Sequence, residues 1–222
     1  MIPQFQSREQ QSPLLNAIIA NALQPNNHEL LRHLGQVLGL KANSQVLLIA
    51  EAGDEVRQTL EQEFNCQVEV FEGPLRRLPF ASASFDATIV AIPLLNDIHT
   101  VADELSRVLK ASGSLGMVTF SIYREHMPDD DELFHQVTPL VATTRPAAAY
   151  RAVLAEAGFT AFVMKDRRRD LRRAAQRSSG QAQLQEAPEA PIQQHPDLAS
   201  QAIGLLATGG VGVVLITAEK GL

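Results

Sequence analysis

The feature that most constrains the fold is a buried strand, an amphipathic helix and a second buried strand in close succession between residues 87 and 120. Residues 87–92 (ATIVAI) form a short apolar, β-branched run without alternation, as is typical of a strand covered on both faces. Residues 115–120 read in the same way. We therefore expect two parallel strands that are joined by a right-handed helical crossover.

The helix of this unit is predicted from apolar residues that recur every three or four positions. They are Ile98, Val101, Leu105, Val108 and Leu109. We expect the helix to stop at Ser112-Gly113, because glycine adopts the left-handed conformation that closes many helices.

Length and composition indicate a single domain with a substantial core. The chain has 222 residues, of which 45% are hydrophobic and 20% charged. We assign residues 1–40 to an N-terminal helical arm and residues 41–222 to the main domain. One cysteine, Cys66, excludes an internal disulfide and a cysteine-rich metal site, and we predict no metal site. No apolar run is long enough for a membrane span and no signal pattern opens the chain, so we expect a cytoplasmic protein.

Two stretches around this unit carry a family resemblance. Residues 78–90 (LPFASASFDATIV) and residues 104–118 (ELSRVLKASGSLGMV) resemble class I S-adenosylmethionine-dependent methyltransferases, particularly the quinone-biosynthesis and arsenite-methyltransferase-like branch. Arsenite itself is an improbable substrate, because a lone cysteine cannot supply several thiolates. The resemblance implies a Rossmann-like α/β fold: a doubly wound, mostly parallel sheet with an antiparallel C-terminal strand.

The cofactor loop departs from the family pattern. After the first core strand, residues 46–50, the family commonly reads VLDLGCGTG, whereas this chain reads VLLIAEAGD. Ala50 and Ala52 replace glycines, and Asp54 stands at the last glycine position. A left-handed alanine would cost roughly 1–2 kcal/mol, and Asp54 would face the carboxylate of the cofactor.

The resemblance implies S-adenosylmethionine as the cofactor and assigns residues to its site. These are Ala50, Glu51, Ala52, Gly53, Glu72 and Pro93. Glu72 ends the second strand, where the family places a carboxylate that accepts hydrogen bonds from the ribose hydroxyls; the alternative is a solvated loop residue. The chain also lacks about one strand-helix unit, and we favour a deletion after the second strand over loss of the second strand itself.

Catalytic residues are harder to assign, because methyl transfer depends mainly on positioning and on exclusion of water. Tyr123 and His126 follow the strand at 115–120, at the edge where ligand sites of α/β proteins form, and His99 follows the strand at 87–92. We select these three as candidate catalytic residues, with an exposed connecting loop as the alternative for Tyr123 and His126.

A basic run between residues 165 and 177 is the other charged feature. It holds Lys165, Arg167, Arg168, Arg169, Arg172, Arg173 and Arg177. A phosphate-binding face is one interpretation, and a solvated helix is the favoured one, because no aromatic residue interleaves to stack on bases. With a net charge of −6, nucleic acid is a disfavoured partner.

Two functions therefore stay open. One is an S-adenosylmethionine-dependent methyltransferase, a transferase that acts on a small-molecule substrate. The other is a methyltransferase-like protein without cofactor that serves as a scaffold or regulatory partner of another protein, and a homo-oligomer is compatible with it. The degenerate loop motif and the missing unit favour the second function.

Overall fold

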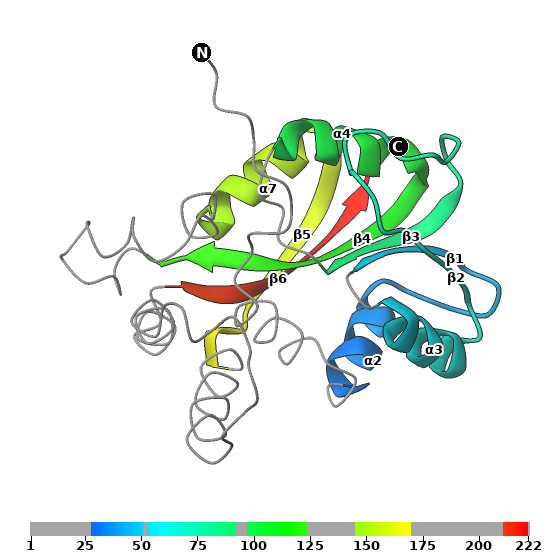
Figure 1. The fold of residues 1–222 in the computed structure, drawn as a ribbon. Coiled ribbons are helices and arrows are strands. Elements are labelled where there is room, and N and C mark those ends of the chain that lie inside the picture. The colour runs from blue at the N-terminus through cyan, green and yellow to red at the C-terminus, as the bar shows by residue number, and fades with distance from the viewer. Residues whose placement is uncertain (1–27, 51–52, 92–96, 124–144, 170–210, 222) are drawn as a thin grey trace, which may run out of the picture.

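The chain folds into a six-stranded sheet with helices on both faces (Figure 1). The computed structural model describes residues 28–50, 53–91, 97–123, 145–169 and 211–221. Its strands are β1 (Gln45–Ala50), β2 (Gln67–Val70), β3 (Phe85–Ala91), β4 (Leu109–Ile122), β5 (Phe159–Asp166) and β6 (Val211–Lys220). Its helices are α2 (His28–Val37), α3 (Gly53–Phe64), α4 (Ile98–Val108) and α7 (Ala147–Glu156).

The sheet has the strand order β2-β1-β3-β4-β6-β5. Strands β2, β1, β3 and β4 are parallel neighbours, whereas β6 inserts antiparallel between β4 and β5. The prediction of a mostly parallel, doubly wound sheet with an antiparallel C-terminal strand is confirmed. The strands predicted at residues 46–50, 87–92 and 115–120 are present, and so are the strands that apolar runs at residues 67–71 and 211–218 predict.

The sheet is also shortened as predicted. In the doubly wound order 3-2-1-4-5-6, a third strand would lie beyond β2. Residues 71–84, all of which are described, connect β2 to β3 without a helix or a further strand. Because β2 pairs directly with β1, the second strand is retained and the unit after it is the one that is missing.

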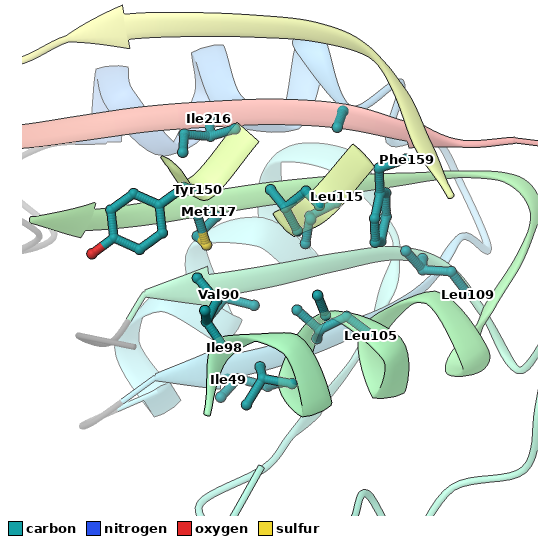
Figure 2. Packing of buried hydrophobic residues seen from close by; sticks show 14 of the residues in the cluster. Ile49, Val90, Ile98, Leu105, Leu109, Leu115, Met117, Tyr150, Phe159 and Ile216 are labelled. Carbon is teal, nitrogen blue, oxygen red and sulfur yellow. The ribbon is translucent and has the colours of Figure 1, made fainter. Parts of the chain in front are cut away.

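Two cores lie on opposite faces of the sheet. On the first face, α2 and α3 cover β1, with Leu34 and Leu60 almost fully buried. On the second face, α4 and α7 pack over β3 and β4, and their apolar side chains meet those of the sheet (Figure 2). Within that core, Phe80 stacks edge-on against Phe71 and Phe85, so the 71–84 connection covers the sheet in place of a helix.

The end of α4 differs from the prediction. The helix ends at Val108, and Leu109 already has extended backbone at the start of β4. The left-handed residue is Ser112, with φ 58°, in an irregular part of the β3–β4 pairing. Gly113 is needed for a different reason: a Cβ atom there would lie 2.9 Å from Lys110 O and 3.2 Å from Asp86 O.

The N-terminal region is described from His28 onward. Leu31 and Leu34 of α2, and Leu38 directly after it, are buried in the same core as β1 and α3, and the boundary at residue 40 stays a prediction. The sequence also predicts helices at residues 14–23, 129–141 and 196–207, and all three lie outside the described residues. None of the helices in the described ranges is long and apolar enough to cross a membrane.

Candidate functional site

The candidate site lies at the carboxyl ends of β1 and β2. Every residue of β1 from Val46 to Ala50 is buried, so this strand is fixed in the middle of the core and its carboxyl end is rigidly placed. Strand β1 is followed by α3, which begins at Gly53. This strand-to-helix junction is the place where open α/β sheets bind ligands, because the free N–H groups at the start of the helix point toward the carboxyl edge.

Gly53 permits the close approach of α3 to the sheet. A Cβ atom at this position would lie 2.7 Å from Cγ1 of Val70 and 3.6 Å from Cδ2 of Leu48. A side chain there would require the Val70 side chain to shift. Gly53 therefore has a packing role at the edge of the site, comparable to the glycine that allows close helix–strand packing in dinucleotide-binding folds.

The backbone at Ala50 is unstrained. Its φ is not positive, so the predicted penalty for a left-handed alanine does not arise at this position. Glu51 and Ala52 lie outside the described residues, as does Pro93. Ala50 itself is buried, with 5% of its surface exposed, and aligns with Ala91 of β3.

Glu72 follows β2 directly, at the carboxyl edge of the sheet. The register pairs Leu48 with Val70, and the Phe71 N–H donates to Leu48 O at 2.9 Å. Two residues farther along each chain, Glu72 is level with Ala50. Its side chain is exposed, so the carboxylate is accessible at the edge of the site.

The start of α3 is acidic. Asp54 and Glu55 both lie in its first turn, where their negative charges complement the helix dipole. The Asp54 side chain is 76% exposed, and its Oδ1 is 3.0 Å from Nη2 of Arg57. The carboxylate thus points to solvent and to a cation, which weakens its predicted repulsion of a cofactor carboxylate.

Two of the three candidate catalytic residues, His99 and Tyr123, are described, and they contact different partners. His99 lies in the first turn of α4, and its Nδ1 is 3.3 Å from Oε2 of Glu156 on α7, with both side chains exposed. Tyr123 follows the end of β4 and packs against Arg168. His126 lies outside the described residues. The catalytic roles of all three stay predictions.

The contact between Tyr123 and Arg168 was missed by the sequence reasoning. The guanidinium carbon of Arg168 lies 3.9 Å from the centre of the Tyr123 ring. The basic run therefore has an aromatic partner, but it comes from a different strand and no pattern within residues 165–177 signals it. Burial and then the negative charge of Asp166 raise the pKa of the Tyr123 phenol to about 12.

The motifs that carry the family resemblance lie at the opposite, amino-terminal edge of the sheet. Arg107, at the end of α4, donates to Phe80 O at 2.7 Å and to Leu78 O at 3.1 Å. Glu104 accepts from the Leu78 N–H at 2.7 Å and from Arg107. The bonds from Arg107 hold the pKa of Glu104 below its usual value. Glu104 and Arg107 thus form a clamp on residues 78–80.

Asp86 has a similar structural role. Its Oδ2 accepts from the Gln45 N–H at 2.8 Å, at the start of β1, and its Oδ1 lies 2.8 Å from Lys110 Nζ. Partial burial acts to raise the pKa of Asp86, but the bonds from Lys110 and Gln45 outweigh it and lower the pKa. The side chains of this motif therefore join strands and do not face the carboxyl edge.

Metal ligands are not grouped in the described ranges. No set of three or more His, Cys, Asp or Glu side chains there could hold a metal ion. Cys66 is buried, and burial raises the pKa of its thiol.

Comparison with protein families gives one match. Residues 24–117, less than half of the chain, match the family described as "Methyltransferase domain". The match spans the β1–α3 junction, Glu72 and the amino-edge motifs. It does not distinguish the quinone-biosynthesis and arsenite-methyltransferase-like branch, which stays a prediction. No protein of curated function matches the chain in sequence.

Solved structures share the fold at low sequence identity. A putative sarcosine dimethylglycine methyltransferase from Galdieria sulphuraria is 13% identical with a TM-score of 0.73, over 88% of this chain and 86% of that one. Geranyl diphosphate C-methyltransferase from Streptomyces coelicolor A3(2), with Mg²⁺, geranyl diphosphate and S-adenosyl-L-homocysteine, is 13% identical with a TM-score of 0.69, over 95% and 85%.

One similar structure carries a different activity in its description. The [4+2]-cyclase SpnF is 15% identical with a TM-score of 0.63, over 95% of this chain and 93% of that one. The chain therefore has the Rossmann-like fold of class I methyltransferases, and its activity has to be argued from the site.

Proposed function

We propose that the chain is an S-adenosylmethionine-dependent methyltransferase that acts on a small molecule. The observation that carries this proposal is the arrangement at the carboxyl edge, where the start of α3, the end of β1 and the exposed Glu72 lie together. The methyltransferase-domain match and the methyltransferases with the same fold support it.

The residues present fit the cofactor. Glu72 offers an exposed carboxylate to accept hydrogen bonds from ribose hydroxyls, and the small Ala50 is buried at the end of β1. The first amides of α3 face the same edge and suit a negatively charged group. The negative charge of Asp54 repels such a group, and the ion pair of Asp54 with Arg57 weakens this repulsion.

In this proposal the bound cofactor supplies an electrophilic methyl group on a sulfonium. The protein orients the cofactor: the ends of β1 and β2 set how far the nucleoside enters between the strands and α3, and Glu72 binds its ribose. Rate acceleration comes from alignment of the acceptor with the methyl group and from exclusion of water.

A second candidate function is a cofactor-free scaffold or regulatory partner. The observation that favours it is the acidic first turn of α3, where Asp54 and Glu55 stand in place of a bare glycine turn. Under this alternative the two carboxylates only stabilise the helix, by about 0.3–1 kcal/mol each.

Amide hydrogen exchange separates the two functions. If the proposal holds, S-adenosylhomocysteine slows exchange in peptides covering residues 46–57 and 68–73, and leaves the amino-edge residues 104–110 unchanged. Unchanged exchange in all three regions at a ligand concentration of about 1 mM would support the scaffold function instead.

A further inference from the structure

A polar cluster lies at the ends of β4 and β5, away from Ala50 and Glu72. We name it the Tyr123 cluster, and its members are Tyr123, Asp166, Arg168 and Gly212. Strands β4 and β5 are both antiparallel to β6, so they run in the same direction. The cluster therefore lies at the same carboxyl edge as the proposed cofactor site.

Arg168 is held in place from several sides. Its guanidinium stacks on the Tyr123 ring, and its Nε donates to Oδ2 of Asp166 at 2.6 Å. Its own N–H donates to Oδ1 of Asp166 at 2.8 Å. Its stem packs over Gly212, where a Cβ atom would lie 2.2 Å from Arg168 Cγ. These contacts remove most of the freedom that an exposed arginine would lose on binding a ligand.

The outer edge of the Arg168 guanidinium stays available. Nη1 and Nη2 donate no hydrogen bond to another residue in the described part of the chain, and 28% of the side chain is exposed. A fixed guanidinium edge matches the paired oxygens of a carboxylate or phosphate.

Tyr123 helps to hold Asp166 in the cluster. Because burial and the Asp166 charge raise the pKa of its phenol to about 12, the hydroxyl keeps its proton at neutral pH. The phenol is hydrogen-bonded to Asp166, so it fixes the carboxylate that positions Arg168 and adds no negative charge beside it.

We propose that the Tyr123 cluster is a subsite for an oxyanion, the carboxylate or phosphate of the methyl acceptor, with Arg168 as the specificity-determining residue. Strand β3 separates β4 from β1, and the register sets Ala50 level with Val118, so Tyr123 lies five residues farther along the strand direction. At about 3.3 Å per residue and about 4.8 Å per strand, the cluster lies roughly 20 Å from the end of β1, and the acceptor is then an extended small molecule whose anionic group lies at the far end from the methylated atom. The anion site stands on its own contacts, whereas its assignment to the acceptor rests on the proposed methyltransferase function.

The test is anion binding to the full chain without cofactor. The chain has two tyrosines and no tryptophan, so ring-labelled tyrosine gives a simple NMR spectrum in which Tyr123 can be followed. The probes are inorganic phosphate, benzoate and benzamide, the last being an uncharged analogue of benzoate. We expect phosphate or benzoate to shift the Tyr123 signal in a saturable way, and benzamide to leave it unchanged.

Matched variants test whether Arg168 is the residue that binds the anion. Arg168→Met is expected to weaken anion binding about tenfold or more, whereas Arg169→Met, which removes the same charge one residue away, changes it less than twofold. Arg168→Lys keeps the charge and most of the packing, and it is expected to lose severalfold because the planar fork is gone. Thermal unfolding of each variant checks that the fold is intact.

The outcomes are distinct. Tighter binding of phosphate indicates a phosphorylated acceptor, and tighter binding of benzoate indicates a carboxylic acid. Equal affinities in wild type, Arg168→Met and Arg168→Lys, an equal response to benzamide, or no response to either anion would overturn the subsite. Anion binding that persists in a chain that does not bind S-adenosylhomocysteine would leave the subsite standing and remove the methyltransferase assignment.

Discussion

The two edges of the sheet differ in how closely their residues follow the methyltransferase sequence pattern and in what those residues do in the structure. At the amino-terminal edge the residues follow the methyltransferase pattern closely, and their side chains are engaged in hydrogen bonds between segments: Glu104 and Arg107 hold residues 78–80, and Asp86 joins β1 to Lys110. At the carboxyl-terminal edge the pattern is degraded, yet the strand-to-helix junction and the exposed Glu72 are present.

This difference indicates that the motifs with the clearest family resemblance stabilise the fold of this chain and do not form its proposed binding site. The 71–84 connection has no helix or strand of its own, so it depends on the Glu104–Arg107 clamp and on the packing of Phe80. The residues on which the proposed activity depends lie at the other edge, where the sequence resemblance is weakest. The predictions below ask whether the amino edge determines stability alone and the carboxyl edge binding alone.

The largest effect is expected for Arg107→Met. The change leaves Leu78 O and Phe80 O without their donor and leaves Glu104 without its cation. We expect a loss of about 2–4 kcal/mol in the free energy of unfolding, which lowers Tm by roughly 5–15 °C. Thermal unfolding measures it.

The control for this variant is Arg76→Met on the same connection. Arg76 is 73% exposed, and its Nε is 3.5 Å from Asp97, so its removal should change Tm little. A clamp variant that is as stable as wild type would contradict the structural role of the amino edge. An affinity for S-adenosylhomocysteine that falls tenfold in folded Arg107→Met would show that the two edges are not separate.

Glu72→Gln tests the carboxyl edge. The amide keeps the shape of the side chain and removes the charge that would strengthen hydrogen bonds from ribose hydroxyls. We expect about tenfold weaker S-adenosylhomocysteine binding with stability within about 0.5 kcal/mol of wild type. Glu69→Gln makes the same change at an exposed position within β2 and should alter neither property. Equal affinities of the two variants would remove Glu72 from the site.

Asp54→Asn also tests the carboxyl edge, but here the expected change is a gain in affinity for S-adenosylhomocysteine. If the cofactor carboxylate approaches the start of α3, removal of the Asp54 charge should raise the affinity for S-adenosylhomocysteine about threefold, at a stability loss of about 0.5 kcal/mol. Glu55→Gln, in the same helical turn, is the matched control. An affinity gain for both variants would indicate general electrostatics and not a local contact.

The smallest effect concerns Asp86 and pH. Its pKa is lower in the folded protein than the unfolded value of about 3.9. The carboxylate therefore contributes stability that is present above about pH 4 and is lost as pH falls through the lowered folded pKa. Because 41% of the side chain is exposed, we expect less than about 1 kcal/mol. The free energies of unfolding of wild type and Asp86→Asn, measured between pH 7 and pH 3, should converge at low pH. A constant difference between the two across this range would contradict this role.

Much of the fold could be predicted from sequence. The buried strands and the apolar face of α4 follow directly from local patterns, and the short connection after β2 revealed the missing unit. The end of α4 was misplaced, because Gly113 is required by the close approach of Asp86 O and not by a helix cap.

The candidate site was less accessible to sequence reasoning. The positions of Gly53 and Glu72 follow from strand order, so the resemblance could propose them. The stack of Arg168 on Tyr123 depends on β6 inserting between β4 and β5, and on Gly212 leaving room for the arginine stem. Such a contact joins distant segments through the sheet, and no local period in the sequence encodes it.

The most direct test of the central claim is a calorimetric titration of the full chain with S-adenosylhomocysteine. We predict saturable binding at one site with a Kd between about 1 µM and 100 µM, that is, about −8 to −5.5 kcal/mol. No heat of binding at a ligand concentration of about 1 mM would contradict the account, and the carboxyl edge would then belong to a methyltransferase fold without its cofactor.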